Sequence, residues 1–112
     1  MKIKLSGIGA LINALNSETV NPRIKEAVKK NGADMHQKAL ELVPVDTGTL
    51  KRSITLEIKD GGLTAEVKEH TEYGVYLELG TRYMAAQPYM RPALNFVKDK
   101  FRNDLKKVVD WW

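Results

Sequence analysis

The sequence predicts an α+β fold, in which N-terminal helices and a long C-terminal helix cover one face of an antiparallel β-hairpin or small sheet. Apolar residues recur at three- and four-residue intervals toward both ends of the chain, as they do along one face of an α-helix. In the middle of the chain they alternate with polar residues, which is the pattern of a half-buried strand. A chain of 112 residues has the length of one domain, so we expect residues 1–112 to form a single unit.

Two helices are predicted before the middle of the chain. The first follows a serine N-cap and covers about Gly7–Leu15. Its apolar stripe consists of Leu5, Ile8, Leu11, Ile12 and Leu15. Asn21 and Pro22 are typical of the N-cap and first position of a second, longer helix. Its apolar face continues to Leu42, and Pro44 ends the helix.

A β-hairpin and a further helix are predicted in the second half. The segments SITLEIK (53–59) and LTAEVKE (63–69) alternate apolar and polar residues, and Asp60-Gly61-Gly62 between them can supply the positive φ of a turn. Each segment has one apolar face, so the helices should cover one side only. A hairpin alone is marginally stable, and we therefore expect a third strand or a neighbouring subunit to extend it. Residues from about Pro92 to Trp112 form an amphipathic helix.

Composition argues against several classes of protein. The net charge of +4 is compatible with nucleic-acid binding, but basic and acidic residues alternate in segments such as DKFRNDLKK, which is typical of solvated helix faces. The chain has no cysteine, which excludes disulfides and thiolate metal sites and fits a reducing compartment. Its apolar runs are far shorter than the roughly 20 residues of a membrane span, so we expect no membrane partner.

No arrangement of residues indicates catalysis or metal binding. His36 and His70 lie in different predicted elements and lack the spacing that places two ligands on one helix face. His70 has Glu69 and Glu72 as neighbours, but no further ligand is evident. No serine occupies a nucleophile elbow, and no glycine-rich loop precedes a phosphate-binding lysine. We therefore expect no enzyme, no catalytic or cofactor-binding residues, no metal and no cofactor.

Two unusual segments flank the hairpin. In the first, VPVDTGTLKRSI (43–54), Asp46, Thr47 and Gly48 are predicted to form a structural turn between helix and strand. The second, YGVYLELGTRYMAAQPYMRPAL (73–94), is rich in tyrosine, methionine and proline and has few charges. Its beginning suits a short helical turn.

Together these segments resemble the small neck proteins of long-tailed bacteriophages and their prophages, which are head-tail connector or tail-completion proteins. The resemblance extends over nearly the whole chain. The first motif, Pro-Val-Asp-Thr-Gly-x-Leu-x-x-Ser-Ile, is filled by Pro44, Val45, Asp46, Thr47, Gly48, Leu50, Ser53 and Ile54. The second is filled by Tyr73, Tyr76, Glu78, Gly80, Thr81, Pro88, Tyr89, Pro92, Ala93 and Leu94. Tyr89 departs from the pattern, in which phenylalanine is more usual.

The resemblance implies a structural protein of the virion that joins the DNA-filled head to the tail or completes the head-proximal end of the tail. It also implies a homo-oligomeric ring, expected to be six-fold, around a channel through which the genome passes without being read in sequence. The expected partners are other neck and tail proteins. The expected locations are the virion and, during assembly, the host cytoplasm. The alternative is a small basic nucleic-acid-binding accessory protein.

A ring contact joins two different faces of neighbouring subunits, for which an extended arm with aromatic anchors is suited. We expect Tyr83, Met84, Tyr89 and Met90 to supply apolar contact while Pro88 and Pro92 keep the arm extended. The candidate oligomer-interface residues are Tyr73, Tyr76, Glu78, Arg82, Tyr83, Met84, Pro88, Tyr89, Met90 and Arg91. The alternative is a loop that packs on the helices of its own chain.

Glu78 is flanked by Leu77 and Leu79, so we expect it to be partly buried with a partner. The predicted partners are backbone N–H groups of the turn at residues 80–82, Arg52, Arg82, or Arg91 of an adjacent subunit. The alternative is an exposed glutamate in a surface turn.

Overall fold

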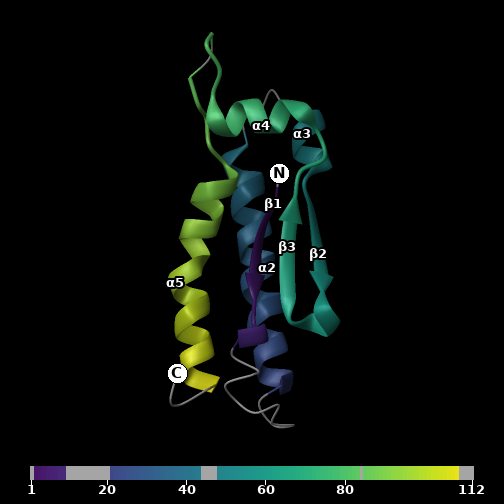
Figure 1. Cartoon of the computed structure of the whole chain (residues 1–112), viewed down its shortest axis with the longest axis vertical. Helices are drawn as coiled ribbons and strands as arrows, with labels where there is room; N and C mark the ends of the chain where they lie inside the picture. Colours follow the sequence, from purple (N-terminus) through teal and green to yellow (C-terminus); the bar gives the residue numbers. More distant parts are fainter. Residues whose placement is uncertain (1, 10–20, 44–47, 84, 109–112) are drawn as a thin grey trace.

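The sheet at the centre of the fold has three antiparallel strands in the order β1-β3-β2 (Figure 1). The strands are β1 (Lys2–Ser6), β2 (Thr55–Lys59) and β3 (Thr64–Lys68). The helices are α2 (Asn21–Leu42), α3 (Gly48–Ser53), α4 (Glu72–Leu79) and α5 (Met90–Val108). The structure, a computed structural model, describes residues 2–9, 21–43, 48–83 and 85–108. It confirms the predicted α+β fold.

The predicted hairpin is confirmed as β2 and β3. These strands are joined by the short helical turn η1 (Asp60–Gly62). All three turn residues have positive φ, at 55° for Asp60, 65° for Gly61 and 101° for Gly62. Glycine adopts this backbone region without steric cost, which explains why two glycines stand at this position.

The third strand comes from the N-terminus of the same chain. β1 pairs with β3 in a register that places Ile3 opposite Val67 and Leu5 opposite Ala65. Counting Leu5 in a helical stripe was therefore wrong, because Lys2–Ser6 alternates polar and apolar residues with the period of a strand. Most of the helix predicted over Gly7–Leu15 lies outside the described residues. Residues 8 and 9, which belong to the described part of this segment, are helical.

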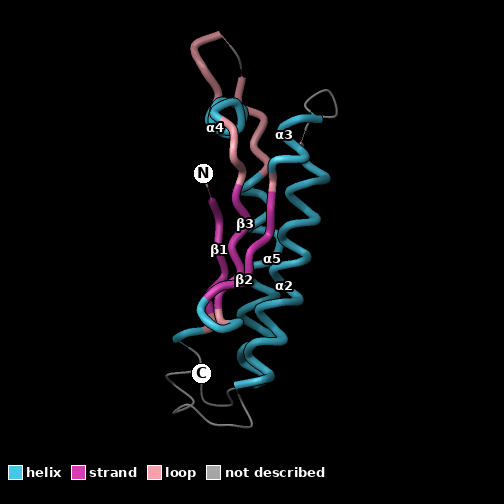
Figure 2. The backbone as a smooth tube through the Cα atoms, turned by 90° about the vertical axis from the view of Figure 1, so that its right-hand side faces the viewer, coloured by secondary structure: helices cyan, strands magenta, loops and turns pink. Residues whose placement is uncertain are grey.

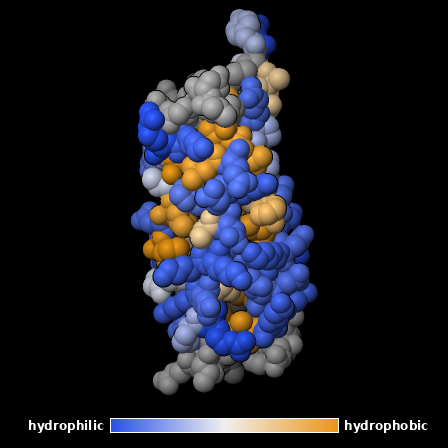
Figure 3. Space-filling model, turned by 180° about the vertical axis from the view of Figure 1, so that it is seen from behind, coloured by the Kyte–Doolittle hydropathy of each residue, from blue (hydrophilic) through white to orange (hydrophobic). Residues whose placement is uncertain are grey.

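Helices α2 and α5 pack side by side on one face of the sheet, which we call the inner face, and neither of them covers the opposite, outer face (Figure 2). The buried residues of α2 are Ile24, Ala27, Val28, Asn31, Gly32, Met35 and Ala39. Those of α5 are Met90, Ala93, Val97, Phe101 and Leu105. Both sets recur at helical spacing, as predicted. Hydrophilic side chains cover much of the opposite surface of this helix layer (Figure 3).

The close approach of α2 to the sheet depends on Gly32. A Cβ atom at this position would lie 2.5 Å from the Cβ of Ala65 on β3. Gly32 lowers the intrinsic helix propensity of α2, but it allows the helix backbone to approach the central strand closely. Gly32 is therefore a packing requirement of the interface between α2 and the sheet.

Two short helices lie near one end of the molecule, and α4 runs across that end (Figure 1). Gly48 is the first residue of α3, a helix that we did not predict, whereas Asp46 and Thr47 lie outside the described residues. α4 begins after Thr71, whose hydroxyl accepts a hydrogen bond from the Gly74 N–H at 3.2 Å. This side-chain cap explains why the helix begins at residue 72.

After α4 the chain projects from the body before it returns as α5 (Figures 1 and 2). We call residues 80–83 and 85–88 the arm. All of these residues are exposed except Gly80, which is half-buried.

Candidate functional site

Glu78 joins α4 to the beginning of α5. Its side chain is 9% exposed. One carboxylate oxygen accepts hydrogen bonds from the N–H groups of Tyr89 at 3.0 Å and Met90 at 2.7 Å, and the other accepts from Arg91 at 3.2 Å. The first turn of a helix leaves its N–H groups without intrahelical partners. Glu78 satisfies these donors in α5, and its negative charge also favours the helix N-terminus.

The sequence explains why a distant carboxylate performs this role. The residues before α5, Gln87-Pro88-Tyr89, include none of the preferred N-cap types Ser, Thr, Asp or Asn. Pro92 in the first turn has no N–H to satisfy. The three donors that Glu78 binds are therefore the ones that most need an acceptor.

The prediction that Glu78 is partly buried with a partner is confirmed, but its donors within the chain differ from those predicted, and pairing with Arg91 of an adjacent subunit stays a prediction. The donors come from residues 89–91, not from the turn at 80–82, and no ion pair joins Glu78 to Arg52 or Arg82 within the described part of the chain. The arginine at 91 contributes its backbone N–H within the same subunit. The role of Glu78 in an oligomer interface stays a prediction.

Tyr89 and Met90 lie in the core of their own chain, which corrects our placement of them on an exposed arm. Tyr89 is 0% and Met90 1% exposed. They stand at the beginning of α5, where the buried stripe of that helix continues toward the arm. Pro92 likewise lies within the first turn of α5 and not in an extended segment.

A close contact with α4 holds the Tyr89 ring in place. A Cβ at Gly74 would lie 2.4 Å from the Tyr89 hydroxyl oxygen and 2.5 Å from a carboxylate oxygen of Glu69. Burial, together with the charges of Glu69 and Glu78, raises the pKa of the Tyr89 phenol. Its hydroxyl has no hydrogen-bond partner among the described residues.

The exposed candidates gather around α4 and the arm. Tyr83 is 89% exposed, Leu79 73% and Tyr76 52%, which are high values for large apolar or aromatic side chains. The Arg82 guanidinium lies 5.8 Å from the centre of the Tyr83 ring. Pro88 and Arg91 are also exposed, whereas Met84 and the side chain of Tyr73 lie outside the described part. Leu79 was not among the predicted interface residues. Because Glu78 was expected to be buried, the next residue on the helix, Leu79, could have been expected to face outward.

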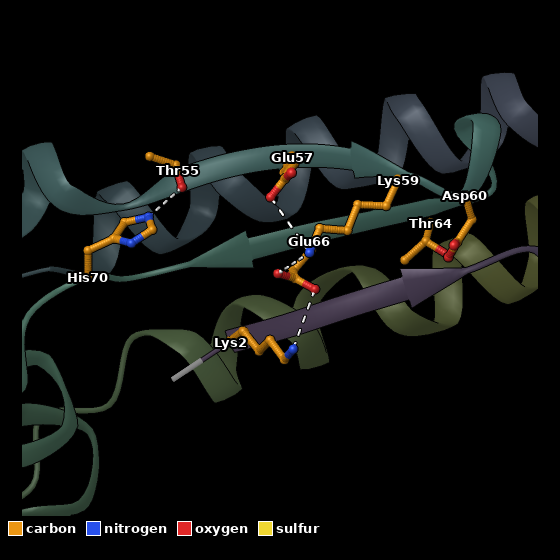
Figure 4. A network of polar contacts seen from close by, with 8 residues as sticks. All are labelled: Lys2, Thr55, Glu57, Lys59, Asp60, Thr64, Glu66 and His70. Carbon is orange, nitrogen blue, oxygen red and sulfur yellow. Dashed lines mark hydrogen bonds and ion pairs between the residues drawn. The ribbon is translucent and has the colours of Figure 1, made fainter.

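The outer face of the sheet carries a network of charged and polar side chains (Figure 4). Glu66 on the central strand lies 3.2 Å from the Lys59 ammonium and 3.8 Å from that of Lys2. The hydrogen bond from Lys59 lowers the pKa of Glu66, and the same bond raises the pKa of Lys59. At one end of this face, the side chains of Thr55 and His70 form a 2.9 Å hydrogen bond.

Neither histidine belongs to a metal-ligand cluster in the part of the chain that the structure describes. The ring of His36 hydrogen-bonds the carbonyl oxygen of Ile54 at 3.2 Å and so connects α2 to the start of the hairpin. No helix among the described residues is both long and apolar enough to cross a membrane.

Comparison with known proteins identifies the family. The model of the family described as "Bacteriophage HK97-gp10, putative tail-component" matches residues 10–80, which is more than half of the chain. This range includes α2, α3, the hairpin and α4, while β1, α5 and all of the arm except Gly80 lie outside it. No curated protein and no solved structure matches the chain. The chain therefore belongs to the HK97-gp10-like family of bacteriophage tail components.

Proposed function

We propose that this tail component is a structural virion protein of the phage neck, which joins head to tail or completes the head-proximal end of the tail. In this proposal several copies form a ring around the channel through which the genome passes. Its partners are other neck and tail proteins, and it is assembled into virions in the host cytoplasm.

The projecting arm is the observation that supports this role best. Tyr83 near the arm tip has 89% of its surface exposed, and Leu79 at its base has 73% exposed. Exposed aromatic and apolar groups of this kind are typical of surfaces that another protein covers. The arm projects from one end of a molecule that measures 51 × 21 × 19 Å, so it can contact a neighbouring protein beyond the body of its own subunit.

In this proposal the genomic DNA passes through the ring without sequence-specific recognition. The net charge of +4 favours contact with phosphate, which carries no sequence information. The competing function, a nucleic-acid-binding accessory protein, predicts tight binding to duplex DNA at physiological salt that weakens steeply as salt rises. A ring held by apolar contacts does not have this salt dependence.

Deletion of the gene from its phage, followed by electron microscopy, tests the neck role. We expect separate filled heads and finished tails for a joining protein, or tails with a defective head-proximal end for a completing one. Normal virions would refute the proposal.

Complementation of the deletion with arm variants tests the contact itself. Tyr83→Ser should leave the unfolding temperature unchanged, because the side chain is exposed, but should lower the titre of infectious particles. Tyr83→Phe keeps the ring and is the matched control, which should restore the titre. A Tyr83→Ser phage with the titre of the parent would show that the arm tip makes no essential contact.

A further inference from the structure

Among the described residues, no further strand pairs with either edge of the sheet. The order β1-β3-β2 places β1 and β2 at the two edges, and within the described residues each pairs with β3 alone. The unpaired N–H and C=O groups of an edge strand can accept a further strand. Because β1 and β2 are both antiparallel to β3, they run in the same direction.

Charge on the outer face differs between the two edges. The register places Lys4 of β1 and Glu57 of β2 on either side of Glu66, so these three residues form one row across the sheet. Glu66 is buried and paired with Lys2 and Lys59 (Figure 4). Lys4 is exposed and has no ion pair among the described residues, whereas the Glu57 side chain is 65% exposed and lies 3.7 Å from the Lys59 ammonium of the same strand. The row therefore ends in a cation at β1 and in a carboxylate at β2.

The neighbouring row on the inner face has complementary shapes at its two ends. It consists of Leu5, Ala65 and Ile58. Ile58 on β2 is 40% exposed. At the β1 edge, a cavity of about 230 Å³ lies between the strand and α5, and its lining is Leu5, Ser6, Lys98, Phe101, Arg102 and Leu105. One edge thus presents an apolar side chain. The other presents, in the same row of the sheet, a cavity whose lining includes the apolar side chains of Leu5, Phe101 and Leu105.

We propose that the β2 edge of one copy docks on the β1 edge of the next copy as a parallel strand pair, so that the sheet continues between subunits. With the rows aligned, Ile58 enters the cavity beside Leu5 of the neighbour, and Glu57 lies beside the neighbour's Lys4. Both complementary pairs meet in the same alignment, without a shift of register. This inference rests on the proposed ring and names the contact that forms it.

Charge also disfavours a symmetric dimer through β1. Pairing β2 with a second β2 has no such conflict, because β2 carries both Glu57 and Lys59, but it would leave the cavity at the β1 edge empty. Pairing β1 with a second β1 would bring together two strands that each carry Lys2 and Lys4. Like charges on adjacent strands are destabilising. The head-to-tail pairing joins two different surfaces, and such a contact closes into a ring or continues as a filament.

Disulfide crosslinking in virions tests this contact, since the chain has no cysteine of its own. In one chain β1 and β2 are separated by two strand spacings, roughly 10 Å, which exceeds the limit of about 7 Å between the Cα atoms of a disulfide. A chain carrying both Lys4→Cys and Glu57→Cys can therefore form a disulfide at these positions only with another copy. Mild oxidation of virions carrying this variant should give a ladder of multimers up to the size of the ring.

The single variants are the matched controls. Lys4→Cys and Glu57→Cys alone should give no multimers, whereas virions assembled with a mixture of both should give dimers. Dimers from Glu57→Cys alone, or no ladder from the double variant, would overturn the inference. In either case the presence of the protein in the virion still supports the proposed function, whose failure would instead appear as absence of the unaltered chain from virions.

Charge exchange provides a second test if the cysteine variants do not enter virions. Lys4→Glu or Glu57→Lys alone should lower the phage titre at least tenfold. With both exchanges in one chain, positions 57 and 4 of neighbouring copies again carry opposite charges, and most of the titre should be recovered. Titres of the single variants equal to the parent, or no recovery in the double variant, would refute the contact.

Discussion

Replacement of Glu78 is predicted to destabilise the domain by an amount that depends on how many α5 N–H groups lose their acceptor. In Glu78→Gln the remaining carbonyl oxygen can still accept from Tyr89 and Met90, but the new NH₂ group faces the Arg91 N–H, 3.2 Å from the atom it replaces. Loss of one hydrogen bond to a charged group costs about 1.5–3 kcal/mol. In Glu78→Ala three donors at the start of α5 lose their acceptor, and we expect a loss of roughly 3–5 kcal/mol.

Urea unfolding at neutral pH measures both variants, with Glu41→Gln as the matched control. The Glu41 side chain is 55% exposed and lies outside the proposed subunit contact, and changes at such sites usually stay within about 0.5 kcal/mol. Amide hydrogen exchange should also show faster opening at Met90 and Arg91 in the Glu78 variants than in the control. If Glu78→Ala unfolds at the same urea concentration as the unaltered chain, the carboxylate does not stabilise α5 and the reasoning is wrong.

Three further variants test separate parts of the structure. Gly32→Ala should lower the unfolding temperature although alanine is the better helix former, because its Cβ would lie 2.5 Å from that of Ala65; a more stable variant would refute the packing argument. Tyr89→Phe removes a buried hydroxyl that has no hydrogen-bond partner among the described residues. This change should leave the free energy of unfolding unchanged or raise it by about 1 kcal/mol. A clear loss of stability would show that the hydroxyl does have a hydrogen-bond partner. The lowered pKa of Glu66 implies stability that is present above its ordinary value of 4.5 and is lost as pH falls through the lower folded-state pKa. Glu66→Gln should therefore lose less stability than the unaltered chain in acid unfolding titrations, and equal losses would count against the Lys59–Glu66 pair.

The elements that could be predicted from sequence are those whose residues lie close together in the chain. α2, the hairpin and α5 each have a periodic apolar pattern within one segment, and the glycines after Asp60 mark the turn. β1 was missed because its short alternation ran into a helical pattern that shares Leu5. A third strand was nevertheless expected, because a two-stranded hairpin is only marginally stable wherever the additional strand comes from.

The partners of Glu78 could not be derived from local patterns, because they lie 11 to 13 residues away across the arm. Two signals were nevertheless present in the sequence. A glutamate between leucines needed donors, and a helix beginning near Pro92 without a preferred N-cap residue needed an acceptor. Placing Tyr89 and Met90 on the arm hid this match, because their aromatic and methionine character suits an interface as well as a core.

The base of the arm is held on both sides by α4. Where the chain leaves this helix, the Gly80 N–H donates to the Tyr76 carbonyl oxygen at 2.7 Å. Where the chain returns, the Gln87 N–H donates to the Leu77 carbonyl oxygen at 2.7 Å, and Glu78 binds the three residues from 89 to 91. Because the backbone is hydrogen-bonded at both ends of the arm, the exposed tip starts from a fixed base. The buried carboxylate therefore links the stability of α5 to the position of the surface that we propose meets a neighbouring protein.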